Sequence, residues 1–190
     1  MPRLLLLIAS LLFLPVSLSA QATVPESEAP PTPEYDAAPE APMTLARLDE
    51  IIRALDAEAQ SNGTMWQITI NDVQILIVTD AAADRMRAIT PVLKTEEMTP
   101  EDITRVLQAN FDTALDARYA IANEILWSAF IHPLKPLEKD QLISGLGQVV
   151  NLAQSYGTLY SGGALQYGGG DSGALQRQLI DDLLKKGEEI

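Results

Sequence analysis

The segment MWQITINDVQILIV, Met65–Val78, decides how the rest of the chain is interpreted. From Trp66 to Ile70 apolar and polar residues alternate, which is the two-residue period of a half-buried strand. Asn71-Asp72 then predicts a tight turn, and the apolar run from Gln74 to Val78 predicts a more deeply buried returning strand. The segment therefore predicts a β-hairpin.

Upstream of this hairpin the sequence predicts a helix. Thr44 is a suitable N-cap because its hydroxyl can accept from a backbone N–H of the first turn. The apolar residues that follow recur every three or four positions, as on one face of a helix: Leu45, Leu48, Ile52, Leu55 and Ala59. Asn62-Gly63 is predicted to end this helix, since glycine tolerates the left-handed C-cap conformation.

Downstream of the hairpin, Asp84–Val92 predicts a third strand with Arg85 and Arg87 on one face. Pro91 suggests that this strand ends there or lies near a sheet edge, because proline has no N–H for the ladder. A short helix over Ala81–Arg87 is the alternative interpretation.

A second helix is predicted to begin at Thr99-Pro100-Glu101-Asp102, which combines a hydroxyl cap, proline at the first helical position and acids in the first turn. Its predicted single face comprises Ile103, Val106, Leu107, Asn110 and Phe111. We expect this helix to end between Asp112 and Leu115.

From Leu115 the apolar period changes to two, which predicts a fourth strand. Ala122-Asn123-Glu124 predicts a turn, and Ile125–Ile131 predicts a returning strand with large apolar residues. These residues form a second predicted hairpin.

A long helix is predicted from Leu137 to Tyr160, with apolar residues at nearly heptad spacing. Gly145 and Gly147 each cost about 1 kcal/mol against alanine inside a helix, so we expect a strand or helix to approach closely there. Residues 161–173 are glycine-rich and predict a flexible hinge, and residues 174–186 predict a C-terminal amphipathic helix.

The order of these elements is α-β-β-β-α-β-β-α plus a tail helix. Strands grouped in hairpins, with helices set apart from them, predict an α+β domain over residues 43–160. We expect an antiparallel five-stranded sheet with flanking helices.

Residues 1–22 resemble a secretory signal peptide. Arg3 supplies the positive charge, and Leu4–Leu14 is an apolar run too short to span a bilayer comfortably. We expect cleavage after Ala22, with cleavage after Ala20 and an uncleaved anchor as the alternatives. This predicts a periplasmic or secreted protein.

Residues 23–42 are rich in proline and acidic residues and predict a disordered linker.

Without residues 1–22 the chain has 12 basic and 26 acidic residues, a formal net charge of −14. Such a charge disfavours nucleic acid and anionic lipid as partners. The sequence contains no cysteine, so neither a lipoprotein lipid anchor nor a disulfide is available. We expect no membrane insertion after signal cleavage.

Few residues suggest catalysis. His132 is the only histidine, and Asp112 and Asp116 could act with it if the fold brought them together, but no nucleophile motif accompanies them. If these residues have structural roles, we expect Asp116 to form an ion pair with Arg118 on one strand face, and His132 to bind a backbone carbonyl. A small hydrolase of unrecognised type that uses Asp112, Asp116 and His132 is the catalytic alternative.

No metal or cofactor motif is present, so we expect neither. The binding residues are unknown from sequence. Outward-facing aromatic or charged strand residues would mark a binding surface. The weak candidates are Trp66, Arg85, Arg87, Asp116, Arg118, Trp127 and His132.

The succession of elements resembles the type III secretion chaperone-like (Tir chaperone-type) fold, and within it the YbjN-like proteins. The residues that carry this resemblance are ITINDVQILIV, TPEDITRVLQANF, the LDARYAI and ILWSAFIHPL strand pair, and the helix that follows. The resemblance implies a small acidic domain, often dimeric, that binds polypeptide segments without catalysis. This chain differs from the secretion chaperones in its predicted export signal, because those chaperones work in the cytosol.

We therefore expect an exported, non-catalytic module that binds a protein or peptide partner, with a chaperone-like or regulatory role in the bacterial envelope. A homodimer through the long helix or the tail helix is a further expectation. Besides the hydrolase, a small-ligand receptor is an alternative, and it would need a closed apolar cavity.

Overall fold

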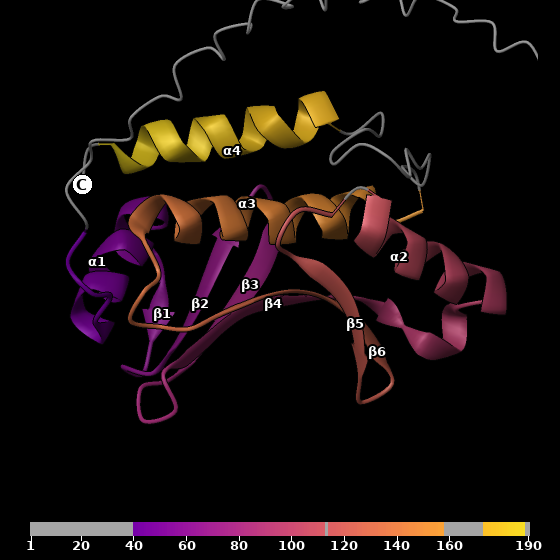
Figure 1. Cartoon of the computed structure of the whole chain (residues 1–190), viewed down its shortest axis with the longest axis horizontal. Coiled ribbons are helices and arrows are strands. Elements are labelled where there is room, and N and C mark those ends of the chain that lie inside the picture. The colour runs from indigo at the N-terminus through magenta and orange to yellow at the C-terminus, as the bar shows by residue number, and fades with distance from the viewer. Residues whose placement is uncertain (1–39, 113, 158–172, 189–190) are drawn as a thin grey trace, which may run out of the picture. The chain divides into compact units, whose positions relative to one another are not determined.

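A computed structural model gives the structure of residues 40–112, 114–157 and 173–188 (Figure 1). The predicted signal peptide, residues 23–39 of the predicted linker and residues 161–172 of the predicted hinge lie outside these ranges. The elements in chain order are α1 (Leu45–Leu55), β1 (Gln60–Ser61), β2 (Met65–Ile70), β3 (Val73–Asp80), β4 (Arg85–Lys94), a short 3-10 helix (Thr95–Glu97), α2 (Pro100–Asp112), β5 (Arg118–Ala122), β6 (Ile125–His132), α3 (Lys139–Ser155) and α4 (Gly173–Gly187).

The described residues form one antiparallel sheet with the strand order β1-β2-β3-β4-β6-β5. The α+β class is confirmed, and so are both hairpins. Their turns use the positive-φ backbone typical of two-residue hairpin loops, at Asn71 and Asp72 and again at Asn123 and Glu124.

The sheet has six strands, so the expectation of five was wrong. The extra strand is β1, because the chain leaves α1 at Asp56 and pairs Ser61 with Trp66. Asn62-Gly63 is therefore the turn of a small hairpin and does not end the helix. The Asn62 side chain accepts from Met65 N at 2.9 Å, and Gly63 supplies a φ of 91°.

β4 continues past Pro91 and lies inside the sheet, between β3 and β6, so the expected strand end or sheet edge was wrong. The register with β6 shifts between Pro91 and Leu93, and the printed pairing with β3 ends at Ile89. This β-bulge lets an internal strand tolerate a residue without an N–H. The alternative helix over Ala81–Arg87 does not form.

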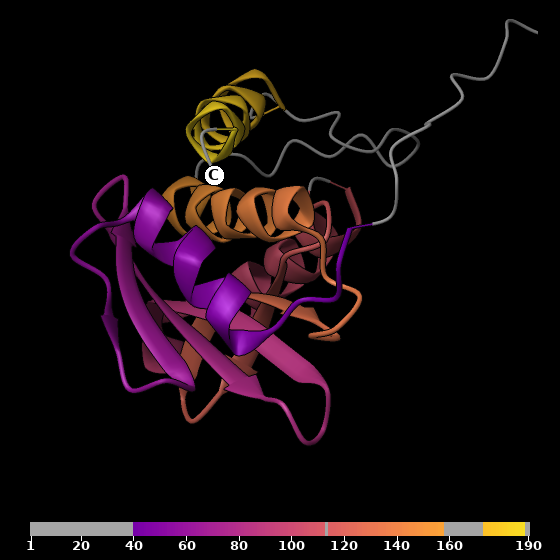
Figure 2. The same cartoon turned by 90° about the vertical axis from the view of Figure 1, so that its left-hand side faces the viewer.

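All the helices that cover the sheet lie on one face of it. α1 and α3 pack over this face, and α4 lies across the outer side of α3 (Figures 1 and 2). The core between sheet and helices is made by alternate strand residues and the inner helix faces. Its largest fully buried members include Trp66, Leu48, Ile52, Ile75, Ile77 and Leu142.

The two glycines of α3 mark close approaches on opposite sides of the helix, as the sequence predicts. A Cβ at Gly145 would lie 2.7 Å from ring carbons of Phe130 on β6. A Cβ at Gly147 would lie 2.9 Å from Cγ1 of Ile180 on α4. Glycine thus lets α3 sit close to both the sheet and the tail helix.

α4 is held on its own domain by apolar contacts and by two lysines. Ile180 and Leu183 are buried beneath it. Lys186 Nζ donates to the Leu55 carbonyl at 2.5 Å, and Lys139 Nζ donates to the Gly187 carbonyl at 2.8 Å. The predicted tail helix is thus part of the helical layer. Among the described helices, none is both long and apolar enough to span a membrane.

A candidate binding surface on the open face of the sheet

The three residues of the catalytic alternative are not held together by any described contact. Asp116 Oδ2 accepts from Gln148 Nε2 at 3.2 Å, and the same glutamine accepts from the backbone of Asp116. The Arg118 guanidinium donates to the carbonyls of Leu115 and Ala117, so the expected Asp116–Arg118 ion pair was wrong. The reason is that the strand begins only at Arg118, which leaves Asp116 in the preceding loop.

His132 ends β6, on the helix side of the sheet. Its ring stacks on Phe130 with 5.9 Å between centroids, and Nδ1 lies 2.8 Å from the Pro133 carbonyl oxygen. The expectation that this histidine satisfies a backbone carbonyl is confirmed. The side chain of Asp112 lies outside the described structure.

Two of the surface pockets in the described part of the chain can be compared with these residues. The larger, about 460 Å³, is lined by Lys94, Thr95, Glu96, Asn123, Glu124 and Ile125. The other, about 350 Å³, lies between the β3 and β4 strands and the end of α3. Neither is lined by Asp116 or His132. Among the described residues no cluster of three metal-binding side chains occurs.

None of the described helices covers the second face of the sheet, and the sheet bends around this face (Figure 1). Cross-strand register arranges its side chains in rows. The first row is Met65, Val78, Arg87 and Ile131. The second row is Gln67, Leu76, Ile89, Ala129 and Arg118, and the third includes Pro91, Trp127 and Ala120. We call these residues the open face.

Large apolar side chains reach solvent on the open face. Ile131 is 61% exposed, and Leu76, Val78 and Ile89 are half-buried beside it. Trp127 is also half-buried, and its indole nitrogen donates to the Ala122 carbonyl at 3.0 Å. Its ring therefore has a fixed orientation on the surface. A contiguous apolar patch without a covering element is typical of a binding surface.

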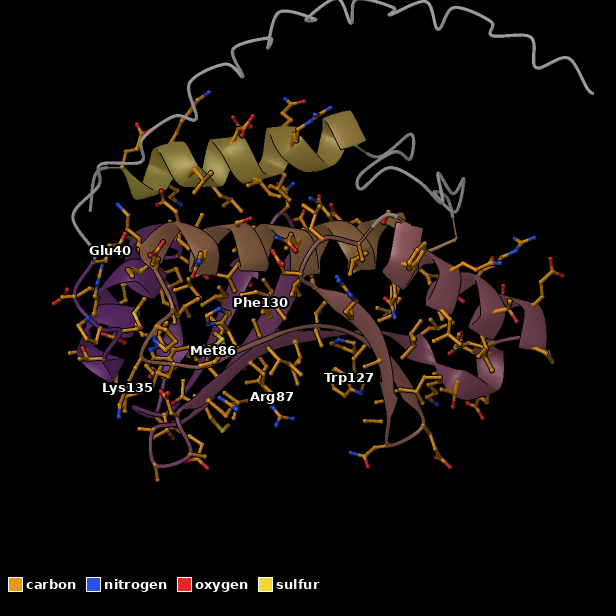
Figure 3. The ribbon with its side chains drawn as sticks, viewed as in Figure 1. Glu40, Met86, Arg87, Trp127, Phe130 and Lys135 are labelled. Atoms are coloured by element: carbon orange, nitrogen blue, oxygen red, sulfur yellow. The ribbon has the colours of Figure 1, made fainter. Side chains whose placement is uncertain are left out.

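The charges of the open face are mostly positive, although the chain is strongly acidic. Asp80 and Arg85 form a further row at the β3–β4 end, which we include in the open face. The charged residues of these described rows are then Arg85, Arg87, Arg118 and one acid, Asp80. Asp80 accepts from two backbone N–H groups of the next turn, at Ala82 and Ala83. Figure 3 shows Arg87 and Trp127 on the side of the sheet away from α3.

The structure divides the binding residues suggested by sequence. It places Arg85, Arg87, Arg118 and Trp127 on the open face, and it places Trp66, Asp116 and His132 elsewhere. Trp66 is 1% exposed, and its indole nitrogen donates to Asp49 at 2.7 Å. Hydrogen bonds from Arg53 and then from Trp66 lower the pKa of the Asp49 carboxyl.

Sequence reasoning missed the aliphatic part of the open face. The sequence predicts Leu76 and Val78 within a more buried strand, and it marks neither Ile89 nor Ile131 as a surface residue. The only available signal was that apolar residues occupy both faces of β3, whereas one face remains uncovered.

A second exposed apolar stripe lies on α2. Leu107 is 64% exposed and Phe111 is 68% exposed, with Ile103 on the same side, whereas Val106 and Ala109 turn inward. The single apolar face expected for this helix is therefore split between solvent and core.

Comparison with known proteins adds a likeness of fold. Neither a family model nor a curated protein matches the chain. Four solved chains match, among them one from the "Structure of the HopA1-SchA Chaperone-Effector Complex". That chain is 9% identical, with a TM-score of 0.45, over 57% of this chain and 91% of its own length. At this identity and TM-score the likeness assigns neither a fold family nor a function to this chain. Membership of the YbjN-like proteins stays a prediction.

Proposed function

We propose that this chain is an exported, non-catalytic binding module that holds an extended polypeptide segment on its open face. The observation that carries the proposal is the uncovered sheet surface, on which Ile131 and Trp127 stand beside half-buried aliphatic residues. Such a surface suits an extended peptide, because the side chains of the peptide and those of each strand both repeat every two residues on one face.

The enzymatic and receptor alternatives have less support. Asp116 and His132 are each engaged by other groups, and no described contact brings them together. The larger described pocket is lined almost entirely by polar side chains, whereas a small-ligand receptor needs an apolar enclosure.

The two tryptophans allow a direct test of the proposed surface. Trp127 lies on the open face, and Trp66 is buried on the other side of the sheet, so their indole N–H resonances report separately. Unfolded model polypeptides added to the ¹⁵N-labelled protein should shift the Trp127 resonance and leave that of Trp66 in place. Ile131→Glu should abolish the shift, and Leu107→Glu on α2 should preserve it. Resonance shifts confined to α2, with the Trp127 resonance unchanged, would refute the proposed surface.

Export belongs to the same proposal. We propose cleavage after Ala22 and a chaperone-like or regulatory role in the bacterial envelope, because the N-terminal sequence has the pattern of a signal peptide. Mass spectrometry of the protein from a periplasmic fraction should give a chain that begins at Thr23. Recovery of the intact chain in the cytosol would contradict this part of the proposal.

A further inference from the structure

We infer that the open face selects peptide segments that carry a carboxylate and a large apolar side chain four residues apart, with Arg87 as the carboxylate anchor. This inference rests on the proposed function and names the class of segment bound. It starts from the contrast between the three arginines of this face and the net charge of −13 of the whole chain.

Arg87 differs from the other two arginines in its contacts. Arg118 donates to two backbone carbonyls, and Arg85 donates to the Asp84 carbonyl at 3.1 Å. The Arg87 side chain has neither a hydrogen bond nor an ion pair with any residue in the described part of the chain. Its guanidinium is thus available for a bidentate contact with a carboxylate.

The neighbours of Arg87 strengthen such a contact. The cross-strand register places Val78 on one side of it and Ile131 on the other. A peptide lying on these side chains would exclude water from the ion pair, and a charge-assisted hydrogen bond is stronger where the local dielectric is low. Arg87 therefore favours a segment that covers its aliphatic neighbours as well as its charge.

The spacing follows from the strand geometry. Trp127 pairs with Pro91, which is four residues from Arg87 along β4. At about 3.3 Å per residue, this places the two side chains roughly 13 Å apart along the strand direction. The row of Ile89 and Ala129 lies between them. An extended peptide parallel to β4 would direct residues one, three and five at Arg87, at this middle row and at Trp127.

An anionic membrane surface fits these observations less well. Three arginines on a face of a chain with net charge −13 give little long-range attraction to a charged sheet of lipid. A single carboxylate within contact distance of Arg87 needs no long-range field, because its interaction is local.

The test uses protein purified after export and two capped pentapeptides. One carries aspartate, valine and phenylalanine at positions one, three and five with serine between them, and the other has the reverse order. Each peptide is compared with a version in which asparagine replaces the aspartate. In titrations followed at the Trp127 indole resonance, at least one of the two aspartate peptides should bind about tenfold more tightly than its asparagine version. High salt should reduce this difference.

Arg87→Gln should remove the preference for aspartate, and Arg87→Lys should retain only part of it because lysine lacks the bidentate geometry. Arg105→Gln changes the net charge equally on α2, where Arg105 pairs with Glu101, and should leave the preference intact. An unchanged Trp66 resonance verifies the fold of each variant.

Four results would overturn the inference, and the last of them would also refute the proposed function. Equal affinities for aspartate and asparagine peptides would do so while leaving the proposed function in place, provided that Trp127 still shifts. An unchanged preference in Arg87→Gln would show that the carboxylate is bound elsewhere. If vesicles containing phosphatidylserine shift the Trp127 resonance and none of the peptides does, a membrane surface is the favoured partner. Absence of a Trp127 shift with every polypeptide would refute the proposed function itself.

Discussion

The side chain of Asn110 on α2 pairs with the backbone of Tyr119 on β5 as a further strand would. Its Nδ2 donates to the Tyr119 carbonyl at 3.0 Å, and its Oδ1 accepts from Tyr119 N–H at 2.7 Å. β5 is the last strand of the sheet, so one amide side chain satisfies edge groups that would otherwise attract another strand.

Asn110→Ala should destabilise the fold by about 1–3 kcal/mol, because it leaves a partly buried donor and acceptor without this partner. Urea unfolding measures the change, and Gln108→Ala on the exposed side of the same helix is the control. Asn110→Asp keeps the acceptor and should fall between wild type and Asn110→Ala. Equal stabilities for Asn110→Ala and Gln108→Ala would contradict the pairing.

Gly145→Ala should destabilise the protein although alanine is the better helix former. The added Cβ would meet the Phe130 ring at 2.7 Å, and overpacking costs about 1–3 kcal/mol against a propensity gain of about 1 kcal/mol. Phe130→Leu in the same chain should recover part of the loss. A double-mutant cycle by urea unfolding measures this coupling, and additive effects would rule out the clash.

Leu183→Asp should release α4 from α3, because it places a charge among buried apolar groups. Trypsin should then cut at Lys185 and Lys186 faster than in wild type. Gln178→Asp introduces the same charge on the exposed side of α4 and should leave cleavage slow. Similar cleavage rates in both variants would mean that Leu183 does not hold the helix.

Acid should weaken the start of α2. Hydrogen bonds from the Thr99 hydroxyl and then from its backbone N–H hold the pKa of Asp102 below its ordinary value. A lowered carboxyl pKa stabilises the fold above the unfolded value of about 3.9, and this contribution is lost as the pH falls through the folded value. Asp102→Asn should flatten the fall in stability between about pH 5 and pH 2. Glu50→Gln is the charge-matched control, and an equal slope in both variants would refute the assignment.

We expect any self-association to use α2, whereas the sequence suggested the long helix or the tail helix. α4 covers the outer side of α3, whereas Leu107 and Phe111 are exposed. Sedimentation equilibrium should show a dimer that Phe111→Glu weakens and Gln108→Glu does not. A monomer at high concentration in wild type would remove this expectation.

The parts of the fold predicted from sequence are those determined by neighbouring residues. Alternation in Trp66–Ile70 identified a strand, and Thr99 with Asp102 identified a helix start, as the reciprocal hydrogen bonds between them confirm. Asn62-Gly63 was misread because a helix C-cap and a hairpin turn both require the positive φ that Gly63 adopts.

Long-range packing decided what the sequence pattern left open. The run from Ile75 to Val78 is apolar on both strand faces, so alternation alone could not show which face the helices would leave bare. Similarly, α2 has apolar residues on two sides, and its position beside β5 selects Val106 and Ala109 as the inner ones. Arg87 and Trp127 could be named from sequence, but their common face with Ile131 required the register.

The docking of α4 on α3 also has a consequence for the order of folding. α4 follows α3 in the chain, and the elements from α1 to α3 already contain the whole sheet. During synthesis, the side of α3 around Gly147 therefore stays uncovered after the sheet residues have been made and until α4 arrives. This interval exposes apolar surface on a nascent chain, which is the condition under which folding intermediates aggregate or are held by other proteins.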